Sequence, residues 1–255
     1  MNVKRTFLIT LIPLLVTGCA TTPDGPTTVP YHPVFEFTPL DTLPPGSAGI
    51  SIALVRPEYP EQERWTQVAP GFAENMPLDF QELLISRGYT TRGPYRSQAE
   101  MVYQDKEQSD LLLTPKLEVR PQVTNVEYDS STRLRLFQPG SSTVNVYRIE
   151  RATVRVGGRV TFEVSEPFTQ ERLWAPSVEL EPSSVTFAGE LEHDEELPDD
   201  AVFREPAFRN AVAKALEEMY TIILEDAWRR LDPAELQVYK AQAMEIAERA
   251  GYIRR

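Results

Sequence analysis

Cys19 is the only cysteine of the chain, and the residues before it have the pattern of an export signal. Lys4 and Arg5 form a short positive start, the apolar run Phe7–Val16 follows, and the small residue Gly18 comes directly before the cysteine. Such a run has the length of a signal-peptide core and is shorter than the about 20 apolar residues that span a bilayer. We therefore expect residues 1–18 to be removed by cleavage between Gly18 and Cys19. An ordinary secretory signal followed by a buried cysteine is the alternative.

The segment that ends at Cys19 resembles the lipobox of bacterial lipoproteins, which usually reads Leu-(Ala/Ser)-(Gly/Ala)-Cys. Val16 and Thr17 replace the commoner Leu and Ala or Ser. The resemblance implies that the Cys19 sulfur is diacylated and that the new amine is acylated. Each buried CH₂ adds about 0.8 kcal/mol, so more than one acyl chain gives stable attachment without a membrane-spanning segment. Ala20 stands where Asp would signal retention in the inner membrane, and we therefore expect the outer membrane.

Arginines at spacings of two and four form the second candidate for chemistry, a patch that would bind an anionic ligand. Guanidinium groups bind carboxylates and phosphates through paired hydrogen bonds, and residues two apart on a strand share one face. Pairing with carboxylates on neighbouring strands is the competing interpretation. The arginines are Arg133, Arg135, Arg151, Arg155 and Arg159, and the expected partners are Glu127, Glu150 and Glu163.

Motifs of the common enzyme classes do not occur in the sequence. It holds no Gly-x-Ser-x-Gly, phosphate-binding loop, dinucleotide fingerprint or His-Glu-x-x-His. The two histidines, His32 and His193, fall in loop-like segments, and no spacing of carboxylates singles out a catalytic pair. The acidic stretch Glu190–Asp200 matches no calcium-ligand template and is expected to be a solvated loop. We expect a protein without enzymatic activity, metal or cofactor.

The net charge of the chain limits the classes of partner that it is expected to bind. Of 255 residues 26 are Lys or Arg and 38 are Asp or Glu, which gives a net charge of −12. Nucleic acids and anionic lipids attract basic surfaces, so neither is expected to bind by charge. With one cysteine no intrachain disulfide can form. Membrane attachment would then rest on the lipid.

The chain divides into three parts by composition. Residues 1–18 form the signal, residues 19–49 a Pro- and Thr-rich tether, and residues 50–255 a single domain. Within the tether, Tyr31–Phe37 is apolar enough to lie against the domain as an edge strand.

The first half of the domain alternates strands and helices. Ile50–Val55 predicts a strand, and Pro70–Arg87 a helix whose firm part begins at Leu78, because Pro77 breaks or kinks it. Gly88 is placed as the residue after the helix end, and a strand begins at Tyr89. Ser97 and Glu100 have capping-box spacing for a helix to about Gln108. Asp110–Arg120 predicts a strand that ends before Pro121.

The second half begins with strands and ends with two helices. Tyr128–Val146 is polar and turn-rich, with a loop at Gln138–Ser142. Three strands are expected, with a tight turn or bulge at Gly157-Gly158 and a hairpin loop at Glu166–Gln170. These strands are Tyr147–Val156, Arg159–Val164 and Arg172–Leu180. The helices are expected at about 206–231, covering the sheet, and 233–250, capped by Asp232 and either peripheral or facing a partner.

These elements predict an α+β fold: a mixed, largely antiparallel sheet covered by helices on one face, with a long C-terminal helix pair. Their order resembles the neuraminyllactose-binding hemagglutinin (HpaA) family of outer-membrane lipoproteins. The motifs that carry this resemblance are Tyr31–Pro33, Leu54–Pro57, Leu83–Tyr89, Leu117–Pro121, Val160–Pro167 and Ala211–Leu216.

The resemblance implies a sialic-acid-dependent adhesin or hemagglutinin. In that family the glycan-binding claim rests on a short Lys/Arg-rich run after the Arg-Pro pair, whereas the corresponding residues here, Gln122–Asn125, carry no basic charge. Tyr128–Val146 has the character of an insertion relative to the family.

We therefore expect a non-enzymatic outer-membrane lipoprotein, an adhesin-like binding protein whose partner is a glycan or an envelope protein. The alternative is a periplasm-facing accessory or assembly factor that contacts peptidoglycan or an envelope complex. A carboxylate-based glycan hydrolase is a third, weaker interpretation.

Overall fold

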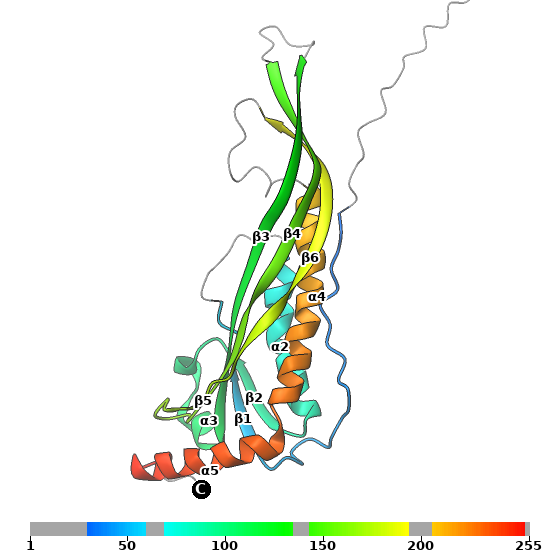
Figure 1. The fold of residues 1–255 in the computed structure, drawn as a ribbon. Helices are drawn as coiled ribbons and strands as arrows, with labels where there is room; N and C mark the ends of the chain where they lie inside the picture. Colours follow the sequence, from blue (N-terminus) through cyan, green and yellow to red (C-terminus); the bar gives the residue numbers. More distant parts are fainter. Residues whose placement is uncertain (1–29, 60–68, 135–142, 194–205, 253–255) are drawn as a thin grey trace, which may run out of the picture.

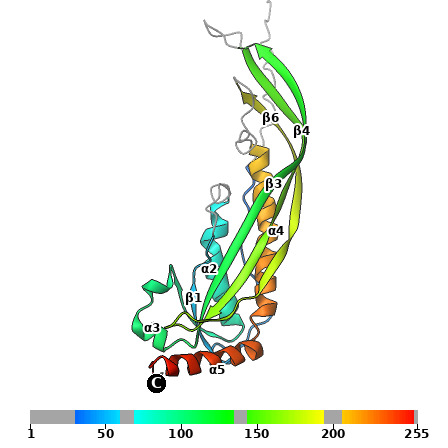
Figure 2. The same ribbon diagram turned by 60° about the vertical axis from the view of Figure 1, so that its left-hand side comes forward.

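The computed structural model describes residues 30–59, 69–134, 143–193 and 206–252. Three long strands, β3 (Leu111–Leu134), β4 (Thr143–Ser165) and β6 (Ser177–His193), form a twisted blade that rises from a broader base (Figure 1). The helices α2 (Pro70–Ser86) and α4 (Pro206–Arg230) lie against one face of this blade (Figure 2). At the base lie α3 (Tyr103–Glu107) and α5 (Pro233–Arg249).

The sheet has six strands in the order β2-β1-β3-β4-β5, with β6 also paired to β4. The strand β1 (Ser51–Val55) runs parallel to β2 (Thr90–Tyr95) and to β3. The pairs of β4 with β3, β6 and the short β5 (Arg172–Trp174) are antiparallel. The predicted α+β class with a mixed, largely antiparallel sheet is therefore confirmed.

The core lies between the sheet and α4, as the period of each element requires. Alternate residues of β4 such as Val154, Val156 and Phe162 are buried on one face, because side chains alternate along a strand. Leu216, Met219 and Ile223 recur at helical spacing on α4 and are buried against them. Each such side chain contributes about 1.5–3 kcal/mol of burial free energy. The prediction that this helix covers the sheet is confirmed.

The strand β3 runs straight through both of its prolines, so the predicted end at Pro121 is wrong. Pro115 lies opposite Phe162 and Pro121 opposite Val156 in the pairing with β4. The Pro115 carbonyl accepts the Glu58 N–H at 2.8 Å, so the backbone polar groups of Pro115 face the edge away from β4. Pro121 faces the same edge by the period of two. Proline is tolerated there because no ladder hydrogen bond to β4 is lost.

Strand pairing also continues through Tyr128–Val146, which was predicted to be polar and turn-rich. The pairs Tyr128↔Ile149 to Leu134↔Thr143 extend the β3–β4 hairpin, and the loop expected at 138–142 lies outside the described residues. The β3 part of this hairpin, Tyr128–Leu134, is mostly polar and therefore has little apolar alternation by which to recognise a strand.

Gly157-Gly158 is not a turn, and β4 pairs with β3 in unbroken register through both glycines. The bulge lies opposite them on β6, where Ser183 and Leu180, three residues apart, pair with Val156 and Gly158, two residues apart. β4 is a single strand where two were expected, and its register with β6 shifts between Val156 and Gly158. The single strand expected at Arg172–Leu180 is two strands, β5 and β6. β6 continues to His193, so the first part of the acidic stretch is strand and not loop, while residues 194–200 lie outside the description.

In α2 the helix continues through Pro77, so its predicted start at Leu78 is wrong. Phe72 and Met76 before the proline and Phe80 and Leu83 after it are all fully buried. Their burial offsets the about 3 kcal/mol that an internal proline costs. Gly88 follows the helix with φ +82°, as predicted.

The helix expected at 97–108 is instead a 3₁₀ turn, Gln98–Glu100, and the separate helix α3. Ser97 makes no side-chain cap, and Glu100 accepts the Arg96 N–H, so the capping box does not form. Extended residues Met101 and Val102 separate the two pieces.

The C-terminal helices are confirmed. Asp232 caps α5 by accepting the Ala234 N–H at 2.9 Å and pairs with Arg87 at 2.8 Å. The edge strand expected at Tyr31–Phe37 does not form, because this segment packs on α2 and α4 instead of on the sheet. Among the described residues no helix is long and apolar enough to cross a membrane.

Candidate binding surface

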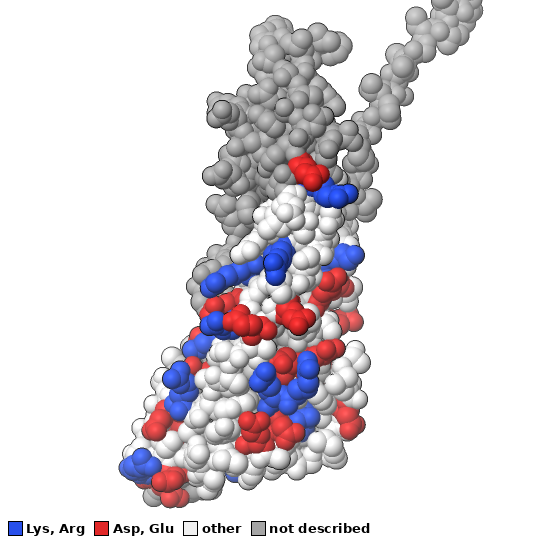
Figure 3. Space-filling view, in the orientation of Figure 1, with Lys and Arg blue, Asp and Glu red and all other residues white. Residues whose placement is uncertain are grey.

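The sheet face opposite α4 carries the arginines that the sequence singled out on β4. Arg151, Arg155 and Arg159 are exposed, whereas Ala152, Val154 and Val156 between them are buried. The three arginines therefore share the face that the helices leave free, as the period of two predicts. We call this face the outer face; Figure 3 shows basic and acidic groups interspersed on the described surface of the molecule.

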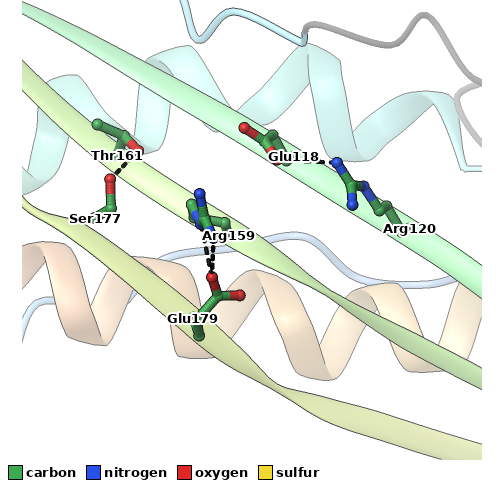
Figure 4. Close-up of polar contacts among 6 residues, drawn as sticks. All are labelled: Glu118, Arg120, Arg159, Thr161, Ser177 and Glu179. Atoms are coloured by element: carbon green, nitrogen blue, oxygen red, sulfur yellow. Dashed lines mark hydrogen bonds and ion pairs between the residues drawn. The ribbon is translucent and has the colours of Figure 1, made fainter.

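Arg159 is neutralised by a carboxylate that the sequence did not single out. Its guanidinium donates to Glu179 Oε1 of β6, and the two residues are in register (Figure 4). This hydrogen bond raises the pKa of Arg159 above its usual range. Next along the face, Thr161 and Ser177 join through their hydroxyls at 2.7 Å.

On β3 the charges of the outer face are paired as well. Arg120 donates to Glu118 Oε2 at 3.2 Å (Figure 4). Lys116 lies 3.0 Å from Glu163 and 3.8 Å from Glu58. Glu163, one of the carboxylates expected to neutralise an arginine, therefore pairs with a lysine.

Arg151 and Arg155 have a different environment. Arg155 is in register with Gln122 of β3 and Ser184 of β6, which are both exposed, polar and uncharged. Arg151 is in register with Glu127, the predicted partner, yet no ion pair joins Arg151 or Arg155 to a carboxylate within the part of the chain that the structure describes. A guanidinium group beside amide and hydroxyl groups, as at Arg155, suits a carboxylate or phosphate, which accepts paired hydrogen bonds.

This environment includes the place where the family that the sequence resembles carries its basic run. Gln122–Thr124 of β3 pair with Thr153–Arg155 of β4. Positive charge is therefore present beside this position, although it comes from the neighbouring strand. Sequence spacing along one strand could not show this, because the juxtaposition depends on the β3–β4 register.

The remaining predicted site residues lie apart from this pair or outside the description. Arg133 lies on β3 opposite Val144, near the far end of the blade, and Arg135 is outside the described residues. Gly18 and Cys19 are also outside them. His32 is exposed on the segment along α4, and His193 ends β6.

No group of three or more His, Cys, Asp or Glu side chains that could hold a metal ion occurs among the residues described. The buried carboxylate Glu166 instead has a structural role. It accepts the N–H groups of Phe168 and Thr169 and so closes the β4–β5 loop, at the position where the sequence predicts a hairpin loop.

Comparison with known proteins rests on structure alone. No family model matches the chain, and no curated protein matches its sequence. A lipoprotein from Neisseria meningitidis (14% identity, 55% of this chain and 83% of that one, TM-score 0.27) and a protein from Xanthomonas campestris (12%, 83% and 99%, 0.32) are too distant to support an argument.

A neuraminyllactose-binding hemagglutinin homolog from Helicobacter pylori is more similar. The match covers 84% of this chain and 100% of the homolog, with a TM-score of 0.57 and 14% identity. At this identity the match concerns the fold, and this chain therefore shares its fold with the hemagglutinin homolog.

Proposed function

We propose that this protein is a non-enzymatic, lipid-anchored binding protein of the bacterial outer membrane, with an adhesin- or hemagglutinin-like role. One combination carries the proposal: a lipobox-like segment ending at Cys19 precedes a domain with the fold of a hemagglutinin homolog. The absence of catalytic motifs from the sequence and the acidic net charge support a binding role toward partners other than nucleic acid.

The anchor is tested by metabolic labelling with radioactive palmitate followed by membrane fractionation. The wild-type protein takes up label and sediments with the outer membrane. Cys19→Ala takes up none and leaves the membrane fraction, because no acyl chain holds it there. An unlabelled wild-type protein, or a Cys19→Ala protein that stays in the membrane, contradicts the proposal.

The ligand that best fits the outer face is an acidic glycan. Its carboxylate or sulfate would be bound by Arg151 and Arg155, with Gln122 and Ser184 donating to neighbouring oxygens. The exposed, paired arrangement at Arg159 and Glu179 is already neutral and would contribute little.

A second candidate is a periplasm-facing accessory factor that contacts peptidoglycan or an envelope complex. The observation that favours it is the uncharged run Gln122–Asn125, which lacks the basic residues linked to glycan binding in the resembling family. The two candidates place the domain on opposite sides of the outer membrane, so surface accessibility distinguishes them.

A further inference from the structure

Residues 30–43, here called the strap, lie along the outside of α4 and end beside the C-terminus of α2 (Figure 1). At the upper end the Tyr31 N–H donates to Asn210 Oδ1 of α4 at 2.9 Å. At the lower end the Leu43 N–H donates to the Ser86 carbonyl at 2.8 Å. The strap therefore follows α4 from near its start at Pro206 toward the base.

Glu217 of α4 holds the upper part of the strap with both carboxylate oxygens. Its Oε2 accepts the Tyr31 hydroxyl, and its Oε1 accepts the Val34 N–H at 3.3 Å. On α2, Asn75 donates to the Phe35 carbonyl at 3.0 Å. Both helices thus bind the strap backbone.

Phe35 fixes the strap by burial. Its side chain is 5% exposed, and its ring centroid lies 5.7 Å from that of Phe72 and 5.1 Å from that of Tyr220. A Cβ at Gly71 would come within 3.2 Å of the Phe35 ring, so the glycine provides space for this packing. Burial of a Phe contributes about 1.5–3 kcal/mol, so the strap is part of the core and not of a free tether.

The bound strap fixes the point at which the rest of the tether, residues 19–29, leaves the domain. The length of these residues relative to α4 then determines which end of the domain lies closer to the membrane. Residues 19–29 span at most about 40 Å when fully extended and about 20 Å as a flexible coil. The 25 residues of α4 are about 37 Å long, and α5 lies at the other end of that helix. At its coil length the tether is about half as long as α4, so an anchor that leaves beside the start of α4 holds that end closer to the membrane than the α5 end. The α5 end reaches the surface only when the tether is stretched to nearly its full length.

We propose that the strap orients the domain on the membrane, with the start of α4 facing the lipid surface and the base around α5 directed away from it. This inference rests on the lipid anchor at Cys19. Release of the strap would add residues 30–43 to the tether, and their additional extended reach of about 50 Å would remove the orientation.

Energy transfer from a single label to a membrane dye tests this orientation. The acylated Cys19 has no free thiol, so one added cysteine is labelled alone: Arg209→Cys in the first turns of α4 or Gln242→Cys on α5, both at exposed positions. The lipidated protein is reconstituted in phosphatidylethanolamine–phosphatidylglycerol vesicles that contain an acceptor lipid. We expect higher transfer from position 209 than from position 242, and loss of this difference when Phe35→Ala and Glu217→Ala are combined.

Val34→Ala is the matched control, because its side chain is 57% exposed on the same strap and its removal should leave the difference intact. Should Phe35→Ala unfold the domain, Tyr31→Phe with Glu217→Gln removes only exposed hydrogen bonds and should reduce the difference. Equal transfer from both positions in the wild type, or a difference that survives strap release, overturns the proposal.

Failure of the anchor is recognised separately. A protein without lipid on Cys19, shown by its mass, does not float with the vesicles, which contradicts the proposed function. Hydrogen exchange of the Val34 amide in that soluble chain still reports strap binding: protection supports a bound strap, and exchange at the rate of an unstructured peptide excludes it.

Discussion

At the scale of single residues, the neighbours of each arginine decide what it can bind. Arg159 of β4 forms an ion pair with Glu179 of β6. Arg155, by contrast, has the uncharged residues Gln122 and Ser184 as its cross-strand neighbours. Exposed ion pairs contribute little to stability because solvent screens them, so the main effect of the pair at Arg159 is to neutralise its charge. The unneutralised arginines nearby are the ones available to an anion.

Replacing Arg151 and Arg155 together with Ala should weaken binding to immobilised sialylated or sulfated glycans by about tenfold or more, since hydrogen bonds to charged groups contribute about 1.5–3 kcal/mol. Binding should also fall with added salt. The control Arg159→Ala should bind like the wild type, because its charge is already paired. Equal binding by the double variant and the wild type excludes this surface as the glycan site.

Asp79 gives a pH-dependent prediction. It accepts the Tyr220 hydroxyl at the α2–α4 interface, and burial raises the pKa of Asp79, with smaller contributions from the hydrogen bond of Tyr220, which lowers it, and from Glu82 and Glu36, which raise it. Because the folded pKa lies above the unfolded value, the protonated form contributes stability at low pH that is lost as pH rises through the folded pKa.

The variant Asp79→Asn keeps an acceptor for Tyr220 without the buried charge. Its free energy of unfolding in urea should exceed that of the wild type at pH 7, and the difference should shrink as pH falls below the pKa of Asp79. A constant difference from pH 3 to pH 7 would show that ionisation of Asp79 has no part in stability.

At the scale of elements, the sequence predicts helices and buried strands well and the blade poorly. The periodicity from Phe208 to Ala227 and the cap at Asp232 locate α4 and α5, because apolar spacing and capping are local signals. The continuity of β3 through Pro121 and of β4 through Gly157-Gly158 depends on which edge faces a partner strand, and this is tertiary information. That the arginines share one face is predictable from the period of two, but the pairing of Arg159 with Glu179 depends on the β4–β6 register.

Gly158 should be the least replaceable glycine of the blade. An ideal Cβ there would lie 1.9 Å from the Glu118 carbonyl oxygen on β3, whereas at Gly157 the nearest atom, on Pro182, is 3.4 Å away. We expect Gly158→Ala to lower the free energy of unfolding by about 1–3 kcal/mol or more, because rigid backbone must shift. Gly157→Ala is the control and should change it by less than about 1 kcal/mol. Equal urea midpoints for the two variants would contradict the close approach.

The α4–α5 elbow depends on Asp232. Asp232→Ala removes the cap on the Ala234 N–H and the ion pair with Arg87, and should lower the free energy of unfolding by about 1 kcal/mol. Asp232→Asn keeps the cap but not the charge and should recover most of that loss. Urea denaturation followed by circular dichroism measures both, and an unaffected Ala variant would show that the cap is dispensable.

At the scale of the whole molecule, the fold combines a blade, a helix layer and a strap that packs on the helices. The hemagglutinin homolog matches this fold over its full length at 14% identity, so the likeness concerns the fold and not the residues that would bind a ligand. The strap and the outer face are therefore the parts where this chain's own function is to be sought. The outer face lies away from the α4–sheet core, so its side chains can differ while the fold is kept.

Protease treatment of intact cells tests most directly whether this is a surface-exposed binding protein. We expect externally added protease to degrade the wild-type chain on intact cells, while a periplasmic control protein stays whole. Survival of the chain on intact cells, with degradation only after the outer membrane is permeabilised, would contradict the adhesin-like role and favour the periplasm-facing factor.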